Sequence, residues 1–109
     1  MKKITPEQLK RKLEEGEVKI LDVRNEEKFE IGRLRHPHAQ NVNVFKGDIF
    51  ALEEGKTSTR LPFTTGEEVI VTCTTGNSAR RCTEILKNEG YNVSLLEGGM
   101  VNWNKVIKD

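Results

Sequence analysis

The chain has 109 residues, 18 of them basic and 17 acidic, so its formal net charge at neutral pH is only +1. Charges of both signs are mixed along the sequence, which excludes the basic stripe of a protein that binds nucleic acid or an anionic membrane surface. No apolar run approaches the ~20 residues that a membrane-spanning helix needs, and no apolar segment follows the N-terminal lysines as in a secretory signal. Two cysteines are too few for the disulfide framework of a small secreted protein. We therefore expect one domain, residues 1–109, in the cytoplasm.

Helix and strand signals alternate along the chain. Thr5 is typical of a helix N-cap, Pro6 of a first helical position, and Gln8 completes a capping box. Strands are expected at 18–24, 41–45, 69–73 and 93–96, a polar loop at 55–66, and further helices at 25–30, about 48–54, after residue 73 and after residue 99. This alternation predicts an α/β fold in which a parallel sheet is covered by helices on both faces.

Cys73 stands where a β-branched strand passes into a glycine-containing loop and then a helix. The N–H groups of such a loop can converge on the sulfur, and the helix macrodipole favours negative charge at the same place. Both effects stabilise thiolate over thiol, and ligands of parallel sheets bind at the carboxyl ends of the strands. We therefore predict that Cys73 is a nucleophile; the alternative is a small buried residue that closes a strand.

The residues after Cys73 are expected to form a cradle for its sulfur and for a bound substrate. Gly76 lets the backbone turn tightly, and the N–H groups from Thr75 through Ser78 would face the sulfur. Asn77 or Ser78 would also serve as the N-cap of the following helix. The predicted substrate-binding residues are Thr74, Thr75, Gly76, Asn77, Ser78 and Arg80. For Arg80 the alternative is a solvated helix face, where it would pair with Glu84.

Three segments in a fixed order resemble the rhodanese family of sulfurtransferases. They are residues 21–24 with Glu27 and Phe29, the loop 73–77, and residues 96–100 with Trp103. The resemblance implies a three-layer fold with a five-stranded parallel sheet, and a ping-pong reaction in which Cys73 carries a sulfane sulfur as persulfide. It also implies a small sulfane-sulfur donor and a thiol, cyanide or protein acceptor.

The loop departs from the family's common pattern at two positions. Many such sulfurtransferases have basic residues at the second and sixth positions counted from the cysteine, where this chain has Thr74 and Ser78. A fixed cation there would attract dianionic thiosulfate. We therefore expect weak activity with thiosulfate and a preference for polysulfide or low-molecular-weight persulfides.

Two other functions are open to a cysteine on this fold. A cysteine phosphatase or arsenate reductase would need an arginine at the sixth residue after the cysteine, where this chain has Ala79. A regulatory or interaction module without catalysis remains the main alternative, although inactive members of such families generally lack the cysteine.

The remaining polar candidates are expected to be structural. His36 and His38 are the only histidines and favour a loop over a metal site, so we expect no metal and no cofactor. Cys82 shares an apolar stripe with Ile85 and Leu86, which predicts a packed thiol. Asp22 and Arg24, at the end of a strand, are expected to form a structural pair.

Overall fold

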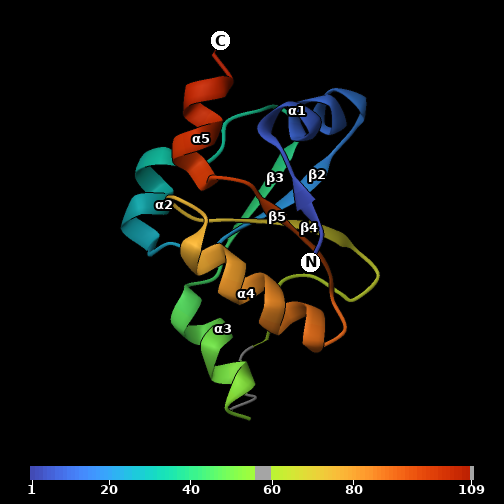
Figure 1. Ribbon diagram of the computed structural model, residues 1–109, viewed down its shortest axis with the longest axis vertical. Coiled ribbons are helices and arrows are strands. Elements are labelled where there is room, and N and C mark those ends of the chain that lie inside the picture. Colours follow the sequence, from blue (N-terminus) through green and yellow to red (C-terminus); the bar gives the residue numbers. More distant parts are fainter. Residues whose placement is uncertain (56–59, 109) are drawn as a thin grey trace.

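The computed structural model describes residues 1–55 and 60–108, and within them one sheet contains all the strands, paired in parallel (Figure 1). The strand order is β1-β5-β4-β2-β3. The strands are β1 (Lys3–Ile4), β2 (Val18–Asp22), β3 (Ala39–Asn43), β4 (Glu68–Thr72) and β5 (Asn92–Leu96). The helices are α1 (Pro6–Glu15), α2 (Glu26–Gly32), α3 (Lys46–Glu53), α4 (Asn77–Asn88) and α5 (Gly99–Val106). The predicted α/β fold with a parallel sheet is confirmed.

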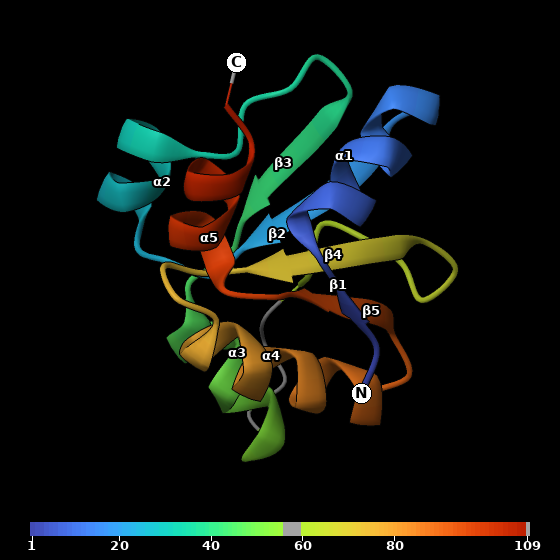
Figure 2. The ribbon, with the colours of Figure 1, turned by 45° about the horizontal axis from the view of Figure 1, so that its top comes forward.

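The sheet separates two hydrophobic cores, and the turned view in Figure 2 shows helices on both sides of it. Helices α3 and α4 cover one face, and α1 and α5 cover the other. Strand β4 serves both cores because its side chains alternate: Val69 and Val71 pack toward α3 and α4, whereas Ile70 packs toward α1 and α5. All three side chains are buried, as expected for a central parallel strand.

The start of α1 follows from its sequence. The Thr5 hydroxyl accepts a hydrogen bond from the Gln8 N–H at 3.1 Å, and the Gln8 side chain accepts the Thr5 N–H at 2.9 Å. Leu9 and Leu13, one turn apart, are completely buried. The predicted capping box and inward face of this helix are confirmed.

Several boundaries differ from the sequence prediction. Strand β3 lies at Ala39–Asn43 instead of 41–45, because its pairing with Val18–Asp22 decides its limits and its own apolar pattern is weak. Strand β1 was not predicted; its two residues pair with Leu95 and Leu96, far away in the sequence. Part of the polar loop expected at 55–66, residues 56–59, lies outside the described residues. None of the described helices is long and apolar enough to cross a membrane.

Candidate active site

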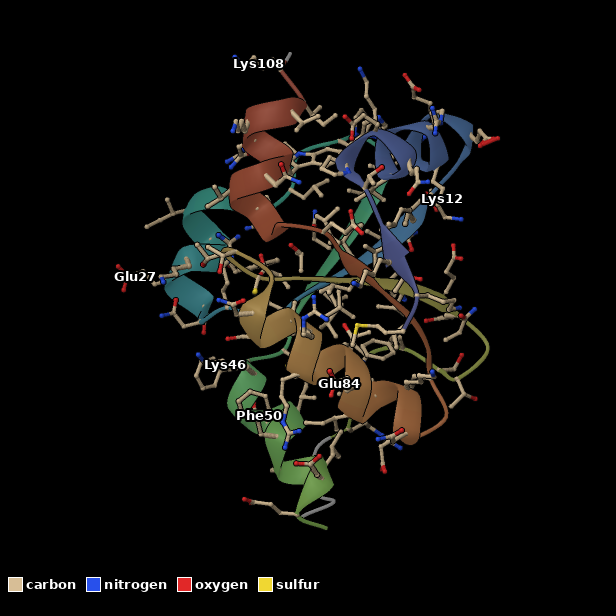
Figure 3. All side chains as sticks on the ribbon, in the orientation of Figure 1. Lys12, Glu27, Lys46, Phe50, Glu84 and Lys108 are labelled. Carbon is tan, nitrogen blue, oxygen red and sulfur yellow. The ribbon has the colours of Figure 1, made fainter. Side chains whose placement is uncertain are left out.

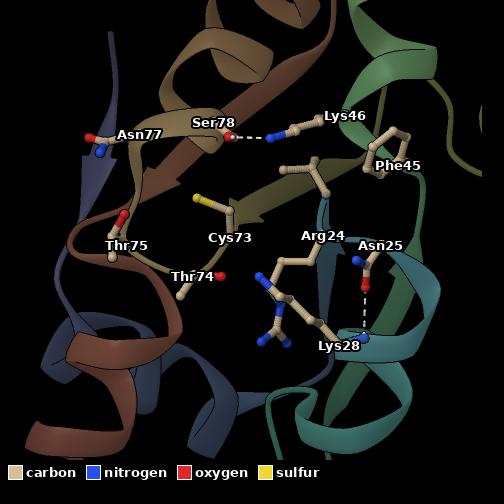
Figure 4. Close-up of a pocket in the computed structure, with 11 residues that line it drawn as sticks. Arg24, Asn25, Lys28, Phe45, Lys46, Cys73, Thr74, Thr75, Asn77 and Ser78 are labelled. Carbon is tan, nitrogen blue, oxygen red and sulfur yellow. Dashed lines mark hydrogen bonds between the residues drawn. The ribbon is translucent and has the colours of Figure 1, made fainter.

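Cys73 directly follows β4, which lies between β5 and β2 in the sheet. Its side chain is only 5% exposed, and its sulfur faces the loop that connects β4 to α4 (Figure 4). The Sγ atom accepts the N–H of Gly76 at 3.1 Å and the N–H of Ala79 at 3.3 Å. The sulfur therefore lies where the backbone offers positive partial charge.

The sulfur also performs the task of a helix cap. Ala79 is the third residue of α4, and the N–H at that position is the one that an N-cap side chain usually binds. Asn77 or Ser78 was expected to be the N-cap, but α4 begins at Asn77 and its N-cap is Gly76, which has no side chain to offer. Gly76 takes a left-handed backbone conformation with φ of 100°, which glycine adopts at little cost. Cys73 Sγ fills the vacant capping role.

The N-terminus of α5 holds the cysteine loop from its other side. The N–H of Met100 donates to the Cys73 carbonyl at 2.8 Å, and the N–H of Val101 donates to the Thr74 carbonyl at 3.0 Å. The close approach requires a glycine at position 99, because a Cβ there would lie 2.5 Å from the Cys73 carbonyl oxygen. These contacts explain why the glycine pair at 98–99 accompanies the cysteine loop.

A cavity of about 280 Å³ opens over the cysteine loop (Figure 4). Three segments of the chain line it, and none of the lining residues is acidic. These residues are Val23, Arg24, Asn25, Lys28, Phe45, Lys46, Cys73, Thr74, Thr75, Asn77 and Ser78. The cavity therefore joins a sulfur held by backbone donors to a basic wall, which suits an anionic ligand.

The sequence model of the family described as Rhodanese-like domain matches residues 5–106. The chain belongs to the rhodanese family. The resemblance of the three sequence segments is thereby confirmed, together with the five-stranded parallel sheet that it implied.

Known relatives share this domain over most of its length. The tRNA uridine(34) hydroxylase of Aster yellows witches'-broom phytoplasma (strain AYWB) is 28% identical over 103 residues, which are 94% of this chain and 32% of that protein. The chain thus spans about a third of the length of the curated relatives it matches.

Solved structures of similar proteins have the same fold. A rhodanese-like domain protein from Staphylococcus aureus is 30% identical, with a TM-score of 0.69 and coverage of 95% of this chain and 92% of that one. A human single-domain sulfurtransferase has a TM-score of 0.74 at 19% identity, with 99% of both chains covered, and this likeness shows the fold alone.

The basic residues that line this rhodanese cavity come from outside the cysteine loop, and they were not among the predicted site residues. Lys46, the first residue of α3, donates from Nζ to the Ser78 hydroxyl at 3.4 Å. Lys28 lines the cavity from α2. Both residues follow the carboxyl ends of two neighbouring strands, β2 and β3. Because ligands of parallel sheets bind at the carboxyl ends of the strands, this position in the sequence could have indicated both lysines.

Arg24 also lines the cavity, but its guanidinium is already occupied. It forms an ion pair with the buried carboxylate of Asp22 at 2.7 Å and donates to the Gly32 carbonyl at 2.9 Å. The predicted structural pair of Asp22 and Arg24 is confirmed.

Arg80 is placed differently from the other predicted site residues. Thr74, Thr75, Asn77 and Ser78 line the cavity and Gly76 donates to the sulfur, whereas Arg80 is exposed and absent from the lining. Its backbone N–H donates to the Gly76 carbonyl within the first turn of α4. Because α4 begins at Asn77, its phase buries Ala79 and leaves Arg80 exposed to solvent.

Cys82 is a packed thiol, as predicted. Its side chain is completely buried in the core between the sheet and α4, beside Ala79, Ile85 and Leu86. The pKa of Cys82 is raised to about 12, first by burial and second by the electrostatic effect of the neighbouring Cys73. The positive charges of Lys46 and Arg81 act in the opposite direction. Cys82 therefore stays protonated, and hence unreactive, at neutral pH.

The two histidines lie in the loop between α2 and β3. The His38 N–H donates to Nδ1 of His36, and Nδ1 of His38 contacts the Leu13 carbonyl. Within residues 1–55 and 60–108, no three His, Cys, Asp or Glu side chains are grouped as metal ligands. The histidines thus connect this loop to the end of α1.

Proposed function

We propose that this rhodanese domain transfers sulfane sulfur through a persulfide formed on Cys73. The observation that carries the proposal is the position of the sulfur, which accepts two backbone N–H groups beside a cavity with a basic wall. Backbone donors stabilise negative charge without titrating. They therefore suit both a thiolate and the outer sulfur of a persulfide.

The proposed reaction has two half-steps. The Cys73 thiolate attacks the outer sulfur of the donor, the donor's S–S bond breaks, and its electron pair leaves with the remaining thiolate or sulfite. A thiol or cyanide, or a thiol on an acceptor protein, then attacks the outer sulfur of the Cys73 persulfide. The new S–S bond breaks, and Cys73 leaves as a thiolate ready for another cycle.

For the donor, we infer an anionic compound, with polysulfide or a low-molecular-weight persulfide preferred over thiosulfate. The cavity has no free guanidinium, because Arg24 is held by Asp22 and the loop itself carries no cation. Its lysines present ammonium groups, which attract an anion but do not bind the sulfonate oxygens in the bidentate manner of an arginine. Thiosulfate is accordingly expected to bind here more weakly than it would beside a free arginine.

A phosphatase or arsenate reductase is disfavoured by the loop itself. The sixth residue after Cys73 is Ala79, which contributes only its N–H, and Arg80 is exposed and does not line the cavity. Those reactions need a guanidinium that clamps the equatorial oxygens of the substrate.

Intact mass spectrometry tests the proposed function. The wild-type protein is incubated in turn with polysulfide, glutathione persulfide and thiosulfate, and then with cyanide. We expect the mass to rise by one sulfur atom, fastest with the first two donors, and to return on addition of cyanide. Cys73→Ser should gain no sulfur, whereas the matched control Cys82→Ala should behave like wild type because Cys82 is buried.

Two results would contradict the proposal. A sulfur adduct that persists in Cys73→Ser would assign the carrier to another group. A wild-type protein that gains no sulfur from any of the three donors would favour the non-catalytic interaction module.

A further inference from the structure

Lys46 is held in position by the backbone around it. Its N–H donates to the Val23 carbonyl at 2.9 Å, which ties the start of α3 to the end of β2. Its side chain is half-buried, and its ammonium donates to the Ser78 hydroxyl across the cavity (Figure 4). Ser78, the second residue of α4, directly precedes Ala79, whose N–H binds the Cys73 sulfur.

The positive charge of Lys46 is not neutralised by a neighbour. Among residues 1–55 and 60–108, no carboxylate pairs with Lys46, whereas Arg24 pairs with Asp22 and Arg81 pairs with Glu53. Figure 3 shows the Lys46 side chain on α3, on the side of α2. The cavity that it lines contains no acidic side chain either. An unpaired, half-buried ammonium beside a nucleophilic sulfur is a ready site for an anion.

The positive charge of Lys46 also affects the pKa of the second cysteine, Cys82. Lys46 is among the groups that lower the pKa of Cys82, which lies beneath the loop in the core. The charge of Lys46 thus extends from α3 to the thiol beneath the cysteine loop.

We propose that Lys46 is the specificity-determining residue of this site, supplying from α3 the positive charge that the cysteine loop lacks and so selecting anionic sulfane-sulfur donors. The proposal rests on the sulfur-transfer function proposed above. Its ligand class is anionic sulfane-sulfur donors, with polysulfides and low-molecular-weight persulfides ahead of thiosulfate, because an ammonium does not clamp sulfonate oxygens as a guanidinium would. Lys28 lines the same cavity but is exposed, so solvent and salt screen its charge. The matched control is Lys10, which is exposed on α1, on the opposite face of the sheet from α3, and does not line the cavity.

Alkylation of Cys73 by iodoacetate and by iodoacetamide measures the effect without any sulfur donor. The two reagents have similar size and differ by one negative charge, and in each case the thiolate displaces iodide to form a thioether. In Lys46→Met, the iodoacetate-to-iodoacetamide rate ratio should fall about five- to tenfold, an effect of one partly screened charge at close range. In Lys28→Met it should fall by a smaller factor because solvent and salt screen that charge, and in the control Lys10→Met it should fall less than about twofold.

Further controls separate charge from structure. Lys46→Arg should keep the wild-type ratio because it keeps the charge. Added salt should lower the wild-type ratio toward that of Lys46→Met. Both reagents react with the same thiolate, so the ratio cancels any change in the thiolate fraction of Cys73, and urea unfolding of each variant shows whether the fold is intact. Peptide mapping of the alkylated site confines the measurement to Cys73.

The same variants are then loaded with polysulfide, and Lys46→Met should load more slowly by a factor similar to the change in alkylation ratio. An unchanged alkylation ratio in Lys46→Met would overturn the inference, whether or not the protein carries sulfur. A lower ratio with unchanged polysulfide loading would overturn the assignment of donor selection to Lys46. A wild-type protein that shows the charge effect but takes up no sulfur would overturn the proposed function instead.

Discussion

The contact between Gly99 and the cysteine loop predicts that Gly99→Ala is strongly destabilising. The substitution places a Cβ 2.5 Å from the Cys73 carbonyl oxygen and 2.7 Å from that of Thr74. Both are backbone atoms, so neither can avoid the clash by a side-chain rotation. Gly99 also has φ of 62°, a left-handed conformation that disfavours alanine.

The magnitude can be worked from these contacts. The left-handed conformation costs alanine about 1–2 kcal/mol. To reach van der Waals contact, α5 and the loop must separate by about 1 Å, which breaks the hydrogen bonds from Met100 and Val101. Each of these contributes about 0.5–1.5 kcal/mol. The expected loss in free energy of unfolding is therefore about 2–5 kcal/mol.

Gly90→Ala is the matched control for the backbone conformation. Gly90 also has a positive φ, 95°, but a Cβ there would meet nothing within 4 Å. Its substitution should cost only the conformational part, about 1–2 kcal/mol. Urea unfolding of both variants measures the two losses, and the rate of Cys73 alkylation by iodoacetamide reports on the loop. That rate should fall only in Gly99→Ala, where the sulfur loses the ordered N–H donors.

Equal losses of stability in Gly90→Ala and Gly99→Ala, with equal rates of Cys73 alkylation, would refute this reasoning. They would mean that α5 does not hold the cysteine loop in place.

Two more predictions concern buried groups. The raised pKa of Cys82, about 12 against an ordinary value near 9, means that the unfolded chain loses this proton first. The free energy of unfolding should therefore fall more steeply in wild type than in Cys82→Ala as pH rises above about 9, and parallel pH profiles from urea titrations would contradict this. Arg24→Met leaves the Asp22 carboxylate buried without its ion pair and should cost about 3–5 kcal/mol in urea unfolding. The control Arg33→Met, which breaks an exposed pair with Glu30, should cost less than about 1 kcal/mol, and similar losses in both would be evidence against the structural role of Arg24.

Features that depend on neighbours in sequence could be predicted. The capping box of α1 joins Thr5 to Gln8, three residues apart, so the sequence alone contains the whole interaction. The position of Cys73 between a strand and a helix follows in the same way from a local order of residues. The buried stripe of α4 that includes Cys82 follows from helical periodicity.

Features that depend on distant segments or on the phase of a helix could not be predicted from the sequence. The cavity receives Lys28 and Lys46 because α2 and α3 begin at the same edge of the sheet, and no local pattern shows which side chains turn inward. Arg80 was expected near the substrate, but the first residue of α4 decides the phase of the whole first turn. That start depends on Gly76 and on the Cys73 sulfur as a cap, an arrangement that differs from the usual serine or asparagine cap.

The parallel pairing of β1 with β5 decides where the ends of the chain lie relative to Cys73. Because β1 runs in the same direction as β4, Met1 and Lys2 precede the amino end of the sheet, whereas Cys73 follows its carboxyl end. Helix α5 begins beside the cysteine loop and carries the chain away from it (Figure 1). Neither end of the described chain lines the cavity, so a tag or a linker joined at either end would begin away from Cys73.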